Sequence, residues 1–171
     1  MNLMRCVSLR SALGPKCIAQ GNFCRLAPIW VALTLAACVP ATLRQAVSPS
    51  GISPLVPAYS VVIRDGDLVF VSGMTGIKPG TQEIVDGGVA IQTRQALENI
   101  RASLQAAGAT MGDVGECTVF LKDMADFAEM NTAYMEFFHV DPPARATLAV
   151  SALPRPAARV EIKCSAVIRH H

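Results

Sequence analysis

Residues 61–71 read VVIRDGDLVFV, two runs of β-branched and aromatic residues on either side of the polar sequence Arg64 to Asp67. Such residues favour extended strands, and an Asp-Gly pair between two apolar runs is a strong signal for a tight turn. The stretch therefore predicts a β-hairpin.

Downstream, the apolar spacing changes to that of a helix and then back to that of strands. After a loop at 73–88 marked by Gly and Pro, apolar residues recur at helical spacing from Val89 to Ala107, and Gly108 is suited to end that helix. Asp126 followed by Glu129 predicts the start of a second helix. The predicted buried side of this helix holds Phe127, Met130, Tyr134 and Phe137. The remaining predicted strands span residues 116–121, 147–151 and 159–168.

The predicted order β-β-α-β-α-β-β defines an α/β (α+β) domain with a single mixed sheet and both helices on one face. Such an arrangement leaves the opposite face of the sheet uncovered, so self-association is expected. With 171 residues, the chain has room for one domain of ordinary size and an appendage.

The first 50 residues have the layout of an export signal. They contain no acidic residue, and four Lys and Arg residues between Arg5 and Arg25 precede the apolar stretch 26–39. This stretch is shorter than the roughly 20 apolar residues that a membrane-spanning helix needs. It ends in Leu35-Ala36-Ala37-Cys38, which resembles the lipobox of bacterial lipoproteins, where the cysteine is lipidated and becomes the mature N-terminus.

We therefore predict a cleaved signal peptide at 1–37, a tether at 38–57 and the folded domain at 58–169. A diacylglyceryl group on Cys38 would carry two acyl chains, and stable anchoring takes two. The expected location is the periplasmic face of a bacterial membrane. The alternative is a cytoplasmic protein whose first 50 residues are a disordered tail or an incorrectly assigned start, with Met4 as a candidate start.

Charge and motifs exclude several classes of function. Removal of residues 1–37 leaves 11 of the 15 Lys and Arg residues against all 13 Asp and Glu residues, a formal charge of −2. This balance argues against nucleic-acid binding by bulk electrostatics. The chain has no GxGxxG, Walker, HExxH or CxxC sequence, so metal-dependent and nucleotide-dependent enzymes are disfavoured. His139, in a predicted loop beside Asp141, is assigned no role.

Six cysteines are present, but three lie in the leader and Cys38 is the predicted lipidation site. The remaining two, Cys117 and Cys164, each lie in a predicted strand. A free cysteine in a strand is most often a small buried hydrophobic residue, so no disulfide framework is predicted.

Several strings are more specific than this pattern of elements. They are Leu121 to Phe127 followed by Asn131, Pro143 to Thr147, Leu153-Pro154 and Val160-Glu161-Ile162, with Ala58-Tyr59, Ser72-Gly73 and Gln92 to Asn99 upstream. Together they closely resemble the signature of the Rid (YjgF-like) family of imine and enamine deaminases, in the same order and near the expected spacing. The resemblance covers roughly residues 51–169.

This resemblance implies a chorismate-mutase-like fold assembled as a homotrimer, with three equivalent clefts between subunits. Family members hydrolyse 2-imino or 2-enamino acids, which pyridoxal-phosphate enzymes release, to 2-keto acids and ammonia without a metal or organic cofactor. The expected function is therefore that of a 2-iminobutanoate/2-iminopropanoate deaminase-like hydrolase acting on small imino acids.

By the same resemblance, Arg145 binds the substrate carboxylate through its forked guanidinium, and Glu161 holds the attacking water and serves as general base. Thr147 matches a position whose backbone contacts substrate and water. Tyr59 matches a tyrosine that forms a wall of the cleft, and Ser72 a serine near the substrate. The alternatives are a surface ion pair for Arg145, a solvated sheet face for Glu161, and ordinary packing for Tyr59 and Ser72.

Three departures from the family pattern bear on the range of substrates. Met74 follows Ser72-Gly73 where close relatives often have Gln, and Lys163 stands where they often have a second Glu. The segment from Arg145 to Glu161 is one residue longer.

Two other functions stay open at the level of sequence. Imines formed in the cytoplasm would not be expected outside it, so an exported copy is also consistent with a non-catalytic, membrane-tethered trimer that binds a small carboxylate. RNA cleavage, attributed to some relatives, is disfavoured by the charge of the domain and by the absence of a basic, aromatic-rich stripe.

Overall fold

The computed structural model describes residues 44–170. The predicted signal peptide at 1–37, the predicted lipidation site Cys38 and the first part of the predicted tether lie outside the described residues. Within residues 44–170, no helix is both long enough and apolar enough to cross a membrane.

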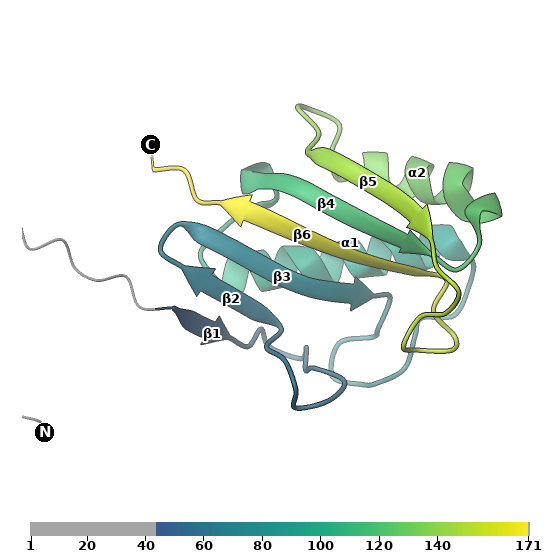
Figure 1. The fold of residues 1–171 in the computed structure, drawn as a ribbon, viewed down its shortest axis with the longest axis horizontal. Helices are drawn as coiled ribbons and strands as arrows, with labels where there is room; N and C mark the ends of the chain where they lie inside the picture. The colour runs from purple at the N-terminus through teal and green to yellow at the C-terminus, as the bar shows by residue number, and fades with distance from the viewer. Residues whose placement is uncertain (1–43, 171) are drawn as a thin grey trace, which may run out of the picture. The chain divides into compact units, whose positions relative to one another are not determined.

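Six strands form one mixed sheet (Figure 1). Across the sheet the order is β1-β2-β3-β6-β4-β5. Strands β4 and β5 are parallel, and every other neighbouring pair is antiparallel. The predicted single mixed sheet is confirmed, with β6, the last strand in the chain, between β3 and β4. In chain order the strands are β1 (Gln45–Val47), β2 (Val62–Asp65), β3 (Leu68–Thr75), β4 (Val114–Leu121), β5 (Ala144–Ala149) and β6 (Val160–Val167).

The predicted hairpin is formed by β2 and β3. Its turn is tight because Gly66 takes a φ of 62°, a left-handed conformation that glycine adopts without a steric penalty. Along β3, Val69 and Val71 are buried while Leu68 and Phe70 are exposed. The hairpin therefore places one face on the core and leaves the other face open.

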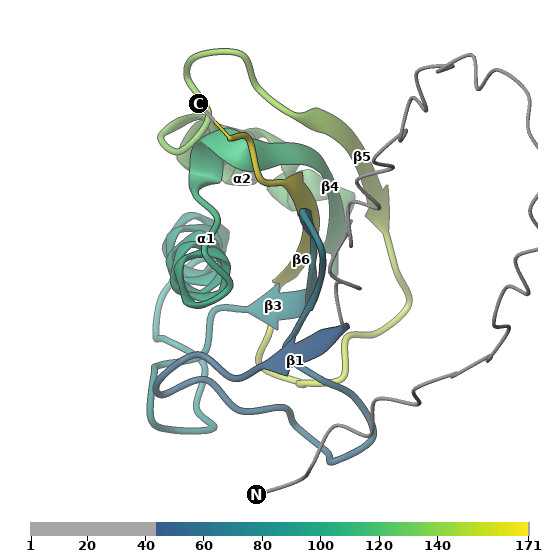
Figure 2. The ribbon, with the colours of Figure 1, turned by 90° about the vertical axis from the view of Figure 1, so that its left-hand side faces the viewer.

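Two helices, α1 (Val89–Ala106) and α2 (Phe127–Met135), cover the same face of the sheet (Figure 2). Short 3-10 helices at Met111–Asp113 and Met124–Asp126 precede β4 and α2. Helix α1 ends as predicted, because Gly108 takes a φ of 81° and the chain leaves the helix there. The prediction of two helices on one face is confirmed.

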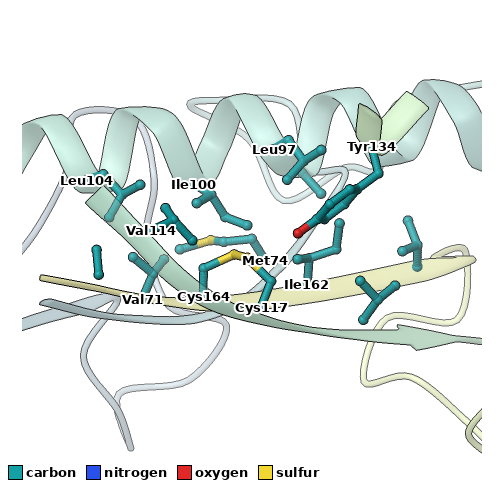
Figure 3. Packing of buried hydrophobic residues seen from close by; sticks show 14 of the residues in the cluster. Val71, Met74, Leu97, Ile100, Leu104, Val114, Cys117, Tyr134, Ile162 and Cys164 are labelled. Atoms are coloured by element: carbon teal, nitrogen blue, oxygen red, sulfur yellow. A yellow bond between two sulfur atoms is a disulfide. The ribbon is translucent and has the colours of Figure 1, made fainter. Parts of the chain in front are cut away.

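The core lies between the helices and the sheet. Leu97, Ile100 and Leu104 of α1 are fully buried, and they pack in one cluster with Val71 and Ile162 of the strands (Figure 3). Burial of a large apolar side chain contributes about 1.5–3 kcal/mol relative to its exposure. This packing holds the strands in the register that positions the candidate site.

Helix α2 differs from its prediction at the N-terminus. The side chain of Asp126 does not cap the helix, because its carboxylate binds the guanidinium of Arg159 at 2.6 and 3.0 Å. Phe127, predicted to be buried, is 39% exposed. Met130 and Tyr134 are buried as predicted.

Part of the predicted tether belongs to the folded domain. Strand β1, at Gln45–Val47, pairs antiparallel with β2. Ile52 is buried in the core cluster. A strand of three residues carries too little periodicity to be recognised from the sequence.

The two cysteines of the domain require a larger correction. Cys117 on β4 and Cys164 on β6 are buried as predicted, but a disulfide joins them. They lie directly opposite one another in the antiparallel β4/β6 pair, with Cα atoms 4.1 Å apart, and the bond lies between the sheet and α1 (Figure 3). The apolar pattern places each cysteine in a strand but does not show which strands pair, so it does not predict this contact.

We expect the disulfide to stabilise the domain by about 2–4 kcal/mol, because its cysteines are 47 positions apart in the sequence and the bond therefore closes a long loop in the unfolded chain. Dithiothreitol should therefore lower the urea midpoint of unfolding of the wild-type protein. The double variant Cys117→Ala, Cys164→Ala is the control and should unfold at the lower midpoint with or without the reductant. Equal midpoints for the oxidised wild type and the double variant would contradict a stabilising role.

Candidate functional site

Glu161 lies on β6 between two core residues. Its neighbours Val160 and Ile162 are fully buried on the helix side of the sheet. Because successive side chains of a strand point to opposite faces, Glu161 lies on the open face. It is half-buried there, and this burial raises the pKa of its carboxyl above the usual range by disfavouring the charged form.

Strand β3 provides the space for this carboxylate. The register of the β3/β6 pair shifts between Val71 and Met74, so that Ser72 and Gly73 form a β-bulge. A Cβ atom on Gly73 would overlap Oε1 of Glu161 and would lie 2.8 Å from its Cδ. Glycine at this position therefore makes room for the carboxylate.

A cavity of about 400 Å³ opens beside Glu161 and is termed the Glu161 cavity. The hydroxyl of Tyr59 accepts a hydrogen bond from the backbone N–H of Leu55 at 2.9 Å, which leaves its own proton available for donation. The hydroxyl of Ser72 donates to the carbonyl oxygen of Ser60 at 2.8 Å. Tyr59, Ser72 and Glu161, three of the predicted site residues, are thus brought together. The cavity is lined by Leu55, Val56, Tyr59, Ser72, Gly73, Thr75, Pro154, Arg155 and Glu161.

Arg145 lies on the edge strand β5, and α2 holds its side chain. One guanidinium nitrogen donates to Oδ1 of Asn131 at 2.7 Å. The guanidinium also stacks on the ring of Tyr134, with its central carbon 4.6 Å from the ring centre. Asn131 is neutral, so it orients the guanidinium without neutralising its charge.

A second cavity, of about 500 Å³, opens beside Arg145 and is termed the Arg145 cavity. His139, assigned no role from the sequence, is one of its lining residues. Asn131 belongs to the strings that carry the family resemblance, but its contact with Arg145 joins two elements and is not visible in the sequence pattern. The cavity is lined by Asn131, Tyr134, Met135, Phe138, His139, Pro142, Pro143 and Arg145.

Thr147 lies two residues beyond Arg145 and therefore on the same face of β5. Its hydroxyl is buried and has no hydrogen-bond partner among the described residues, and the same is true of the hydroxyl of Tyr134. Burial raises the pKa of Tyr134 to about 12, although the charge of Arg145 acts in the opposite direction. Tyr134 therefore stays neutral and presents its aromatic face to Arg145.

Arg145 and Glu161 do not meet within one chain. Cys117 is opposite Arg145 in the β4/β5 register and opposite Cys164 in the β4/β6 register, so Arg145 projects from the helix side of the sheet. Glu161 projects from the open side. The two residues line separate cavities on opposite faces of the same sheet.

Cys38 lies outside the described residues. Of the two substitutions in the family pattern, Met74 is buried in the core, whereas Lys163 is exposed on the open face two residues from Glu161. Within residues 44–170, no group of three or more His, Cys, Asp or Glu side chains could hold a metal ion.

A family model described as Endoribonuclease L-PSP matches residues 52–168. The chain belongs to this family. It is the Rid or YjgF-like family indicated by the sequence strings, and solved structures within it carry both names.

Relatives in the Rid family match most of the domain. A RutC family protein of Pyrococcus horikoshii is 50% identical over 102 residues, which are 60% of this chain and 80% of that protein. The 2-iminobutanoate/2-iminopropanoate deaminase of Mus musculus is 37% identical over 125 residues, 73% of this chain and 92% of that protein. The crystal structure of RidA from an Antarctic Psychrobacter matches with a TM-score of 0.68 at 35% identity, over 72% of this chain and 99% of that one. The predicted chorismate-mutase-like fold class is confirmed.

The geometry predicts that Gly73→Ala displaces the carboxylate of Glu161 toward solvent while the fold survives, because the overlapped atom ends a flexible side chain. NMR titration should show a raised pKa for Glu161 in the wild type and a lower one, closer to the usual range, in the variant, since water then solvates the charged form. Gly115→Ala is the matched control, because a Cβ atom there meets nothing within 4 Å. An unchanged pKa in Gly73→Ala would show that Glu161 is not held against Gly73.

Proposed function

We propose that this Rid-family protein hydrolyses 2-imino or 2-enamino acids to 2-keto acids and ammonia. The mouse and rat relatives, 37% and 38% identical, are named 2-iminobutanoate/2-iminopropanoate deaminase. For this chain, the supporting observation is a pair of complementary half-sites: an arginine held by a neutral amide, and a half-buried glutamate of raised pKa.

Arg145 is suited to bind the carboxylate of such a substrate. A guanidinium carries five N–H donors in a planar fork, and Asn131 takes only one of them. Two of the others can bind both oxygens of a carboxylate and so fix the position of the imine carbon. Stacking on Tyr134 restrains the plane of the fork.

Glu161 is suited to activate the water that attacks this carbon. A general base works best when its pKa approaches the working pH, and burial moves the pKa of Glu161 in that direction. Glu161 takes a proton from water as the water oxygen bonds to the imine carbon, and it passes this proton to the substrate nitrogen. The resulting carbinolamine then transfers its hydroxyl proton, again through Glu161, to the nitrogen as the carbon–nitrogen bond breaks, which releases ammonia and leaves the carbonyl of the 2-keto acid.

The other predicted residues would complete the cleft. The hydroxyl oxygen of Tyr59 accepts a hydrogen bond from Leu55, so the hydroxyl proton is free to be donated to the substrate nitrogen or to water. Ser72 donates to Ser60, so its role is to hold the bulge in place beside Glu161. Thr147 would contribute its backbone next to Arg145.

We propose a homotrimer as the active form, because Arg145 and Glu161 of one chain lie on opposite faces of the sheet. Each of three clefts would take Glu161 from one subunit and Arg145 from the next. The open face supports this assembly, since Leu68, Phe70 and Val167 expose 46%, 46% and 50% of their surface there. Contiguous apolar surface of this kind marks an interface.

We also propose that the domain acts at the periplasmic face of a membrane, anchored through a lipidated Cys38. The basic and apolar leader that ends in Leu35-Ala36-Ala37-Cys38 is one support. The Cys117–Cys164 disulfide is an independent one, because disulfides persist in oxidising compartments and are rare in the cytosol.

RNA cleavage, named in the description of the family model, has less support in this chain. The formal charge of −2 over residues 38–171 gives no general attraction to a phosphate backbone. We therefore propose a small imino acid, and not a nucleic acid, as the ligand.

The proposal predicts faster release of keto acid from imines generated in situ by an amino-acid oxidase or a threonine dehydratase. Arg145→Ala and Glu161→Gln should each reduce this acceleration by about 100-fold or more. Because Glu161 acts as a base only when deprotonated, activity should fall as the pH drops through its raised pKa. Glu161→Gln should remove that dependence.

Arg101→Ala is the control for these variants, because Arg101 pairs with Glu98 on the surface of α1 and should leave activity unchanged. Absence of acceleration with every imine would contradict the deaminase function. Keto-acid binding that depends on Arg145, without turnover, would instead favour the tethered binding trimer.

A further inference from the structure

The Glu161 cavity contains a cation that the proposed reaction does not use. Arg155 lies between Pro154 and Pro156 in the turn that connects β5 to β6, and it lines the cavity together with Glu161. It is the one basic residue among those that line the cavity. The cavity therefore holds one negative and one positive side chain.

Gln82 holds the guanidinium of Arg155 in place. Nη1 donates to the main-chain carbonyl oxygen of Gln82 at 2.7 Å, and Nη2 donates to its Oε1 at 2.5 Å. The flanking prolines restrict the backbone on both sides of Arg155. A side chain that is already oriented loses little conformational freedom when it binds a ligand.

Neither bond neutralises the charge of Arg155, because both acceptors are amide oxygens of a neutral residue. In contrast, four arginines in the described part of the chain pair with carboxylates. Arg44 and Arg64 form no ion pair in that part either, but they line neither the Glu161 cavity nor the Arg145 cavity. The paired arginines are Arg94 with Glu136, Arg101 with Glu98, Arg159 with Asp126, and Arg169 with Asp113.

The arginines of the two cavities are therefore built in the same way. Asn131 orients Arg145, and Gln82 orients Arg155, in each case through a neutral amide side chain. Arg155 has five N–H donors and uses two, so one donor is left on each of its three nitrogens. That is enough for a carboxylate to bind through both oxygens.

We propose that Arg155 binds a second carboxylate, at the side-chain end of the substrate, and that the favoured substrates are 2-imino dicarboxylic acids. This inference rests on the proposed function, in which Arg145 of a neighbouring subunit holds the carboxylate next to the imine carbon. A monocarboxylic imine would leave Arg155 without an anionic partner. Without Arg155, the cavity would present only the negative charge of Glu161 to a second carboxylate.

Binding of reaction products tests the inference without requiring turnover. Calorimetry on the full-length protein should show that 2-oxoglutarate, with two carboxylates, binds about tenfold or more tightly than 2-oxobutanoate, with one. Arg155→Gln should remove this difference by weakening only the binding of 2-oxoglutarate. Gln82→Ala keeps the charge of Arg155 but releases its guanidinium, so it should weaken the binding of 2-oxoglutarate by a smaller factor than Arg155→Gln does.

Arg101→Ala is again the matched control and should leave both affinities unchanged, and thermal unfolding should show that every variant is folded. Turnover then tests substrate preference, with imines that amino-acid oxidases generate from glutamate and from 2-aminobutanoate. Arg155→Gln should lower kcat/KM for the dicarboxylic imine about tenfold or more and change that for the monocarboxylic imine by less than about twofold.

The two proposals fail in different ways. Binding of 2-oxoglutarate that depends on Arg155, without hydrolysis of any imine, would overturn the deaminase function and keep the site for a second carboxylate. Hydrolysis of both imines with equal losses in Arg155→Gln would overturn the dicarboxylate preference and keep the deaminase function. Failure of the wild type to bind 2-oxoglutarate more tightly than 2-oxobutanoate would also overturn the preference.

Discussion

Strand β6 lies at the centre of the sheet, hydrogen-bonded to β3 on one side and to β4 on the other. The alternation of its side chains between the two faces of the sheet determines on which face Glu161 lies. Val160, Ile162, Cys164 and Ala166 point into the core, so Glu161 must point to the open face. A shift of the register by one residue would bury the carboxylate and expose the core residues. The apolar core beneath α1 therefore determines the position of Glu161, the proposed general base.

The same register separates the two half-sites and places a disulfide between two of the strands that connect them. Cys117 lies opposite Cys164 on one side and opposite Arg145 on the other, so the disulfide ties the strand that carries Glu161 to the strand next to Arg145. Reduction would loosen the pair of strands between the two half-sites. The disulfide thus bears on both the stability of the domain and the geometry of the proposed clefts.

Local features of the sequence predict local features of the fold. The hairpin and the end of α1 follow from a turn sequence and from Gly108, since each depends on a few neighbouring residues. The family strings identify Arg145 and Glu161 as candidates, but not their separation on two faces. Three contacts do not follow from the sequence, because each joins segments whose pairing the apolar pattern does not encode. They are the disulfide, the contact of Asn131 with Arg145 and the contact of Gln82 with Arg155.

The central claim is that a complete site takes Arg145 and Glu161 from different subunits. Arg145→Ala and Glu161→Gln chains with different affinity tags can be co-expressed, and assemblies that contain both can be purified through the two tags in succession. The account predicts that these assemblies hydrolyse imines at about a third of the wild-type rate, because one of the three clefts in each mixed trimer receives both intact residues, whereas each variant alone is inactive. Mixed assemblies as inactive as the single variants would contradict it.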